Sequence, residues 1–137
     1  MSNRPSRRVL TYGTFDLLHF GHMRLLRRLA GLGDHVMVGL STDGFNALKG
    51  KKAEWSYERR RRELLATGLV DLVFPEDNWE QKPADVRRLH ADLFAMGDDW
   101  AGHFDFLREW CDVSYLSRTP GISSTLLRQH MRQGTAS

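Results

Sequence analysis

Short apolar runs alternate with stretches of helical periodicity along most of this chain. The run 35–41 is almost continuously apolar, as expected of a parallel strand that is covered on both faces. Alternation of this kind predicts repeated β-α units. The expected strands are 8–13, 35–41, 69–74, 92–97 and 112–116.

The stretches between these strands carry helix signals. In 19–33 the apolar residues recur at helical spacing, and two glycines stand near the expected end. Ser56 is a suitable N-cap for a helix over 57–68, which Gly68 ends. The segment 42–55 is too mixed to assign. The other expected helices are 83–90, 104–110 and 125–132, the last of them capped by Ser123 or Ser124.

This order of elements predicts an α/β fold, a single Rossmann-like doubly wound domain with about five parallel strands. The expected core covers about residues 8–132 of the 137, with loose tails at both ends. In such sheets ligands bind at the carboxyl ends of the strands. The sequences "GTFDLLHFGH", "MGDDW" and "SRTPGISST" follow the first, fourth and fifth expected strands, so they are the candidate site segments.

Composition narrows the class of protein. No apolar run approaches the roughly 18 residues of a membrane span, and the start "MSNRPSRR" has no apolar leader segment, so we expect no membrane insertion and a cytoplasmic chain. Cys111 is the single cysteine, which excludes an internal disulfide. Its place beside Trp110 indicates a buried small hydrophobe rather than a reactive thiol.

Arginine is far more frequent than lysine among the basic residues. Of 20 basic residues only four are lysines, and three of these lie in "KGKK". A lysine is a compact, mobile point charge that suits a phosphate changing its geometry during reaction. A solvated basic loop explains the cluster equally well, and both interpretations stay open. The four lysines are Lys49, Lys51, Lys52 and Lys82.

His19 and His22 are the strongest candidates for chemistry. At a spacing of three they share a helix face, and they fall in the first turn, where free backbone N–H groups favour an anion. Gly21 lets a phosphate approach the backbone closely. A zinc site needs a third and a fourth ligand, and Cys111, His35 and His90 do not stand at a suitable spacing, so no protein metal site is expected. Core packing of both rings is the other alternative, and the helix start makes it less favourable.

The segment "TYGTFDLLHFGH" resembles the H-x-G-H signature of the cytidylyltransferase-like nucleotidyltransferases. The blocks "STDGFNALKGKKAEWSYERR", "NWEQK", "AMGDDWAGHFDFL" and "RTPGISST" resemble, in order and spacing, the bacterial glycerol-3-phosphate cytidylyltransferases. The similarity covers roughly residues 8–128. The H-x-G-H motif alone would indicate only the superfamily. The later blocks narrow the resemblance to the enzymes that act on glycerol phosphate.

The resemblance implies roles for particular residues. It implies that Lys49 and Lys82 contact the acceptor phosphate and gives Trp79 a place on the acceptor side. The implied catalytic residues are His19, His22, Lys49 and Arg118. The implied nucleotide-binding set is Gly13, Thr14, Phe15, His19, His22, Lys51, Asp99, Arg118, Thr119, Gly121, Ile122, Ser123, Ser124 and Thr125.

The chain departs from the family pattern in two places. Ser124 stands where the family often has threonine, which keeps the hydroxyl. Gly68 and Leu69 replace an arginine and an aromatic residue that usually precede "VDEV", while Asp71 is retained. In relatives this arginine helps to organise the site or the subunit contact, so the resemblance does not determine the activity or the dimer geometry of this chain.

The remaining charged features favour structural roles. Four consecutive arginines, 59–62, fan around a helix and form no single nucleic-acid-binding face, so most of them are expected in solvent. Arg60, however, matches an arginine that is common in relatives. Asp16 is expected to be a structural hydrogen-bond partner rather than a catalytic base.

The resemblance implies transfer of CMP from CTP to an alcohol phosphate, sn-glycerol 3-phosphate, with release of pyrophosphate. It implies Mg²⁺ bound mainly through the CTP phosphates, a homodimer, and a link to wall teichoic acid or a related polymer. The alternatives are another acceptor (ribitol, choline or ethanolamine phosphate, or a phosphonate), adenylyl transfer from ATP, and a non-catalytic nucleotide-binding regulator. Nucleic-acid binding, suggested only by the pI of 9.3, ranks last, and no nucleic-acid partner is expected.

Overall fold

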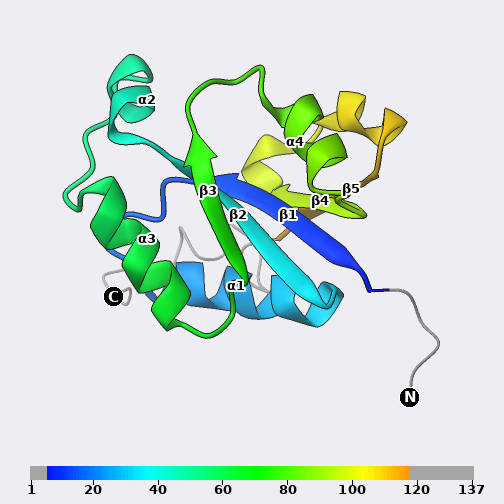
Figure 1. Ribbon diagram of the computed structural model, residues 1–137, viewed down its shortest axis with the longest axis horizontal. Coiled ribbons are helices and arrows are strands. Elements are labelled where there is room, and N and C mark those ends of the chain that lie inside the picture. The colour runs from blue at the N-terminus through cyan, green and yellow to red at the C-terminus, as the bar shows by residue number, and fades with distance from the viewer. Residues whose placement is uncertain (1–5, 118–137) are drawn as a thin grey trace, which may run out of the picture.

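A computed structural model describes residues 6–117, which form one five-stranded sheet with helices on both faces (Figure 1). All strand pairs are parallel, in the order β3-β2-β1-β4-β5. This confirms the predicted α/β doubly wound fold. The strands are β1 (Arg8–Gly13), β2 (His35–Ser41), β3 (Leu72–Glu76), β4 (Leu93–Gly97) and β5 (Asp112–Leu116). The α-helices are α1 (Phe20–Leu32), α2 (Asp43–Leu48), α3 (Tyr57–Ala66) and α4 (Lys82–Arg88).

The strand order reverses beside β1. From β1 the chain moves outward to β2 and β3, then returns to the other side of β1 for β4 and β5. Adjacent parallel strands whose connections leave in opposite directions open a crevice at their carboxyl ends, which is where ligands bind in such sheets. The segments after β1 and β4 flank this crevice.

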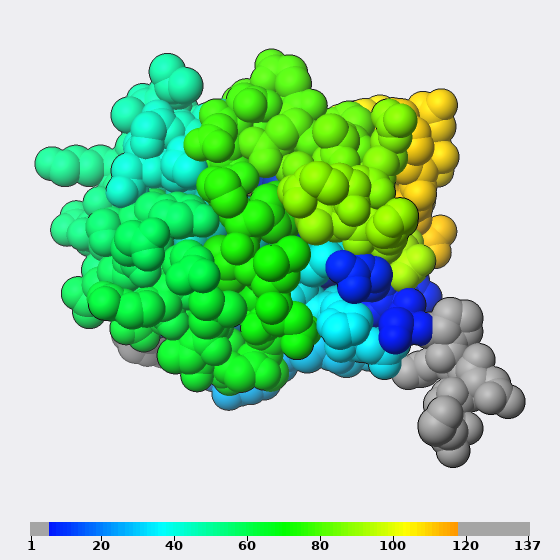
Figure 2. All heavy atoms as spheres, viewed as in Figure 1, coloured from blue at the N-terminus to red at the C-terminus, as the bar shows by residue number. Residues whose placement is uncertain are grey.

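Two apolar clusters make the core, one on each face of the sheet. The first packs α1 and α3 against the sheet, with Leu26, Leu29 and Leu64 fully buried. The second packs α4 on the opposite face through Val86 and Leu89, together with η2, a 3₁₀ helix over Asp105–Glu109. In Figure 1 α1 lies below the sheet and α4 above it. In the space-filling view the atoms of α3 and α4 lie on either side of β3 (Figure 2).

Some boundaries differ from those predicted. The third strand was expected over 69–74 but runs from Leu72 to Glu76. Directly before it, the carboxylate of Asp71 accepts a hydrogen bond from Val36 N. Pro75 lies inside this strand, and an edge strand tolerates it. The helix expected over 104–110 is the short 3₁₀ helix η2, and a second one, η1 (Asp98–Trp100), follows β4 directly.

Helix α2 lies in the segment that the pattern left unassigned. Thr42 caps it, its side chain accepting a hydrogen bond from Phe45 N, and the helix buries Phe45 and Asn46. Six residues are too few to show a helical period, which is why the sequence did not reveal it. The helix expected over 125–132 lies outside the described residues.

Two composition-based expectations can be compared with the described region. Cys111 is half-buried against the second cluster, and burial raises the pKa of its thiol. Within residues 6–117 no helix is long and apolar enough to cross a membrane.

Candidate active site

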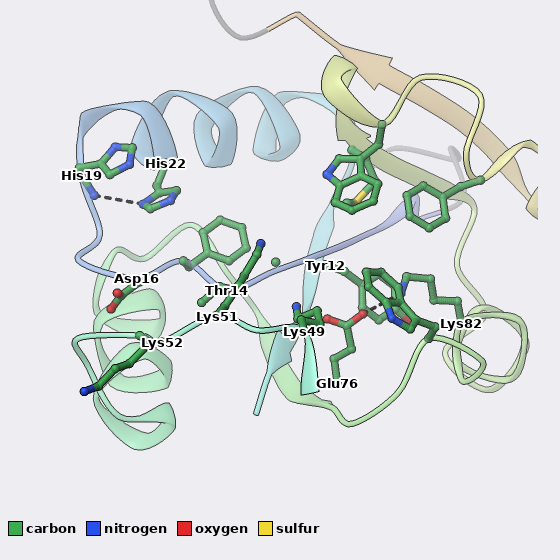
Figure 3. A pocket seen from close by; sticks show the side chains of 17 residues that line it. Tyr12, Thr14, Asp16, His19, His22, Lys49, Lys51, Lys52, Glu76 and Lys82 are labelled. Carbon is green, nitrogen blue, oxygen red and sulfur yellow. Dashed lines mark hydrogen bonds and ion pairs between the residues drawn. The ribbon is translucent and has the colours of Figure 1, made fainter. Parts of the chain in front are cut away.

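A cavity of about 530 Å³ opens at the carboxyl ends of the strands, beside β1 and β4. It brings together nine residues that were predicted for the site, from segments far apart in the chain. Figure 3 shows His19 and His22 at one end of it and Glu76 and Lys82 at the other. The predicted residues that line it are Gly13, Thr14, Phe15, His19, His22, Lys49, Lys51, Trp79 and Lys82.

The turn between β1 and α1 has an unusual backbone. Phe15 and Leu17 both have a φ of 50°, a left-handed conformation that is unfavourable for residues other than glycine. Between them, the Asp16 carboxylate accepts hydrogen bonds from Glu54 N at 2.7 Å and Trp55 N at 2.9 Å. The turn is therefore held in its strained shape by the loop that carries Lys51 and Lys52. Partial burial raises the pKa of the Asp16 carboxyl, but these hydrogen bonds outweigh it and the pKa lies below its ordinary value. The expected structural role of Asp16 is confirmed.

The two histidines build the start of α1. The helix begins at Phe20, so His19 is its N-cap and not a residue of its first turn as predicted. His19 Nδ1 accepts a hydrogen bond from Gly21 N at 3.0 Å, and His22 Nδ1 accepts one from His19 N at 3.2 Å. This reciprocal arrangement is a capping box made of imidazoles. A Cβ on residue 21 would lie 3.0 Å from His19 Cε1, so glycine also makes room for the ring.

These hydrogen bonds determine which ring nitrogen carries the proton. A nitrogen that accepts from a backbone N–H has no proton, so in both neutral rings the hydrogen is on Nε2. The rings stack with centroids 3.8 Å apart. Burial, and secondarily the neighbouring His19, lowers the pKa of His22 to about 4. His22 is therefore a neutral Nε2–H donor at physiological pH.

The Arg60 side chain on α3 stabilises the turn between β1 and α1. The side chain is 0% exposed, unlike the other three members of the arginine run, which are exposed or half-buried. Its guanidinium donates to the carbonyls of Thr14, Ser41 and Trp55 at 2.7–3.1 Å and to the Asp43 carboxylate at 2.7 Å. Arg60 thus joins the end of β1, the end of β2, the start of α2 and the lysine-bearing loop.

Lys49 approaches the cavity from the C-terminal end of α2. Its Nζ lies 4.5 Å from the ring centroid of Phe45 and 5.5 Å from that of Trp79. Burial lowers the pKa of the Lys49 ammonium, and the Glu76 carboxylate opposes this effect. Lys51 and Lys52 are also among the residues that line this cavity, although the Lys52 ammonium points away from the other lining residues (Figure 3).

Lys82 is held differently. It is 1% exposed, and its Nζ lies 2.6 Å from an oxygen of Glu76, which is 3% exposed. The same ammonium lies over the rings of Tyr12, Trp79 and Phe104 at 4.6, 4.7 and 5.5 Å from their centroids. The sequence predicted Lys82 as a ligand of the acceptor phosphate, whereas in this structure its ammonium is bonded within the protein.

Other cavity residues were not predicted from the sequence. An acidic residue at the carboxyl end of an edge strand is the signal that could have indicated Glu76. The aromatic residues gave no signal, because each also fits a core position. The residues missed are Tyr12, Ala53, Glu76, Met96 and Phe104.

The remaining predicted residues are not among those lining the cavity. Asp99 lies in η1, next to Trp100, which does line it. The predicted nucleotide-binding residues Arg118, Thr119, Gly121, Ile122, Ser123, Ser124 and Thr125 lie outside the described residues. Gly68 ends α3 with a φ of 74° and is not a lining residue.

Comparison with known protein families identifies the family of this chain. Residues 10–130 match the family model described as cytidylyltransferase-like. The chain therefore belongs to the cytidylyltransferase-like family.

Similarity to individual proteins indicates a narrower group within this family. The chain is 54% identical to the glycerol-3-phosphate cytidylyltransferase of Bacillus spizizenii over 125 residues, covering 91% of this chain and 97% of that protein. It is 52% identical to the enzyme of the same name from Staphylococcus aureus, again over 125 residues, covering 91% of this chain and 95% of that protein. These identities confirm the resemblance to glycerol-3-phosphate cytidylyltransferases.

The fold is also found in a solved structure of low sequence identity. The lipopolysaccharide core biosynthesis protein of Thermoplasma volcanium superposes with a TM-score of 0.71 at 21% identity, covering 84% of this chain and 99% of that one. This similarity confirms the α/β fold.

Proposed function

We propose that this protein transfers CMP from CTP to sn-glycerol 3-phosphate, giving CDP-glycerol and pyrophosphate. The observation that carries the proposal is one cavity with two oriented imidazole N–H donors at one end and lysine ammonium groups along its wall. The near full-length similarity to glycerol-3-phosphate cytidylyltransferases supports the choice of both substrates.

The reaction needs positioning and charge stabilisation more than proton transfer. The acceptor phosphate is an oxyanion at neutral pH, so it attacks the α-phosphorus of CTP without a general base. The new O–P bond forms as the bond to pyrophosphate breaks, in line, and the electron pair leaves with pyrophosphate. His19 and His22 donate from Nε2 to phosphoryl oxygens whose negative charge grows in the transition state. Lys49 and Lys51 balance the charge of the two substrates.

Mg²⁺ is part of the proposal as an ion held mainly by the nucleotide. Among the described residues no three histidine, cysteine or acidic side chains cluster as a metal site. The cavity carboxylates of Asp16 and Glu76 are occupied by backbone N–H groups and by Lys82. This donor set fits an ion that takes its ligands from phosphates and water. When bound, Mg²⁺ would neutralise charge on the leaving pyrophosphate.

We propose further that the protein is a homodimer. We also propose that it acts in the cytoplasm, the compartment that supplies CTP. Light scattering after gel filtration would check the assembly, with a mass near twice the 15.8 kDa of the chain expected.

The decisive experiment is an acceptor panel. Purified protein is incubated with CTP or ATP, Mg²⁺ and each of several acceptors: glycerol 3-phosphate, ribitol phosphate, phosphocholine and phosphoethanolamine. Pyrophosphate release is expected to be fastest with CTP and glycerol 3-phosphate. Release with ATP or another acceptor would replace the proposal, and CTP binding without release from any acceptor would indicate a regulator.

A further inference from the structure

Asn46 on α2 carries a buried donor that the rest of the described chain leaves unpaired. The residue is 2% exposed, and among residues 6–117 its amide Nδ2 has no hydrogen-bond partner. Its Oδ1, by contrast, accepts hydrogen bonds from Ser41 Oγ at 2.7 Å and from Thr14 Oγ1 at 3.2 Å. A buried N–H group without a partner is rare in proteins and therefore needs an explanation.

The backbone around Asn46 is fixed. Ser41 ends β2 and Thr14 follows β1, and the guanidinium of Arg60 donates to the carbonyl oxygens of both residues. The carbonyl oxygen of Asn46 itself accepts from Lys51 N at 2.8 Å. The torsions that stay free to change are therefore those of the two hydroxyls and of the amide.

The orientation of this amide decides what the Thr14 hydroxyl offers to the cavity that it lines. When Oδ1 faces Thr14, the hydroxyl hydrogen points to the amide, and only oxygen lone pairs are left for a ligand. A half-turn about the Cβ–Cγ bond of Asn46 exchanges Oδ1 and Nδ2. Nδ2 then donates one hydrogen to Thr14 and the other to Ser41, and the Thr14 hydroxyl can donate into the cavity.

We propose that Asn46 is a positioning residue, whose amide turns when phosphate enters the cavity, so that Thr14 donates a hydrogen bond to a phosphoryl oxygen. The inference rests on the proposed function, because it concerns how this cavity receives the phosphates of CTP. The turn keeps both hydrogen bonds to the amide and replaces an unpaired N–H donor by an unpaired carbonyl oxygen, which proteins tolerate better. It also adds a charge-assisted hydrogen bond to the ligand.

Asn46→Asp separates the two orientations. A carboxylate accepts from both hydroxyls, as Oδ1 does, but it cannot donate, so the Thr14 hydroxyl stays turned away from phosphate. With saturating glycerol 3-phosphate, we expect kcat/KM for CTP to fall by about 10- to 100-fold, the effect of one hydrogen bond to a charged group. Thr14→Val, which lacks the hydroxyl, should cause a loss of similar size, and Thr14→Ser a much smaller one.

A double-mutant cycle distinguishes this mechanism from repulsion between the new carboxylate and the phosphates. If Asn46 acts through the Thr14 hydroxyl, Asn46→Asp costs little in a chain that already carries Thr14→Val. Losses that multiply in the double variant, or an Asn46→Asp variant as active as the wild type, would overturn the inference. Asn78→Asp, the same substitution at an exposed loop position, is the matched control and should change kcat/KM much less.

NMR reports on the amide in the wild-type chain, so it also covers the case in which Asn46→Asp does not fold. Nuclear Overhauser contacts between the Nδ2 hydrogens of Asn46 and the Thr14 methyl group are expected to strengthen when inorganic pyrophosphate is bound. Unchanged contacts in a protein that binds pyrophosphate would contradict the turn. Failure of the proposed function looks different: the wild-type protein then releases no pyrophosphate from CTP and glycerol 3-phosphate, although these contacts still respond to added pyrophosphate.

Discussion

The two ends of the cavity carry different kinds of polar group. At the α1 end, Nδ1 of His19 and Nδ1 of His22 each accept a hydrogen bond from a backbone N–H group, which fixes the orientation of both rings. At the α4 end, Lys82 carries a full charge that is removed from water and compensated by Glu76 and three rings. One end thus offers oriented dipoles to a ligand, and the other keeps its charge within the protein.

The difference shows how a site handles a reactant whose charge changes. A neutral donor costs little to desolvate and gains most when an oxyanion forms against it, which favours the transition state over the ground state. A buried ion pair costs much to desolvate and contributes shape and specificity instead. We therefore expect substitutions at the α1 end to lower turnover and substitutions at the α4 end to lower stability.

The largest expected effect is that of Lys82→Met on folding. Removing the ammonium leaves the Glu76 carboxylate buried without a counter-charge, which costs about 3–5 kcal/mol in free energy of unfolding. Urea denaturation measures it. Lys49→Met, at the same end but not ion-paired, is the control and should cost much less. Equal losses in the two variants would mean that the Lys82–Glu76 pair is not a buried structural pair.

His19→Ala is expected to act mainly on turnover. Loss of one oriented donor to the transition state should lower kcat about 100- to 1,000-fold, with a much smaller change in the Kd for CTP. Steady-state kinetics and calorimetric titration with CTP measure the two quantities. If kcat falls and the Kd for CTP rises by the same factor, the imidazole is only a ground-state ligand and the contrast between the two ends is lost.

Arg60→Lys tests the support beneath the α1 end. Lysine keeps the charge but lacks the planar fork that reaches three carbonyls and a carboxylate, so we expect a loss of about 1–3 kcal/mol in unfolding free energy. Arg62→Lys, at an exposed position of the same helix, should change it by less than about 0.5 kcal/mol. An Arg60 variant as stable as that control would contradict the supporting role.

His22 is expected to make the stability of the chain depend on pH. Its pKa is about 4 in the folded chain and about 6.5 unfolded, so between these values the unfolded chain binds more protons. The contribution of His22 to stability is therefore complete above pH 6.5 and decreases as the pH falls toward 4. His22→Asn should show a weaker fall in unfolding free energy over this range. Nitrogen-15 NMR should also show the Nε2–H tautomer of His22 at pH 7, and an Nδ1–H tautomer would contradict the assignment.

The outline of the site could be predicted because its residues stand in recognisable positions along the chain. A glycine turn after β1, two histidines spaced by three and a lysine cluster indicated phosphate chemistry, and the structure brings them into one cavity. The resemblance singled out Arg60 from the four arginines in a row, but the residue pattern alone did not show that α3 packs this one inward. Glu76 was missed for a different reason, because the third strand was predicted to end at residue 74, which left Glu76 outside it, whereas β3 ends at Glu76.

By itself the sequence determined the alternation of strands and helices, the class of fold and the segments from which the site is built. These follow from local properties: hydrophobic period, turn residues and caps. Only the tertiary structure decided which nitrogen of each histidine carries its proton, which arginine is buried, and that the Lys82 ammonium is enclosed by residues from other elements. Those features depend on contacts between segments distant along the chain, and such contacts exist only when the sheet and its two helical layers are assembled.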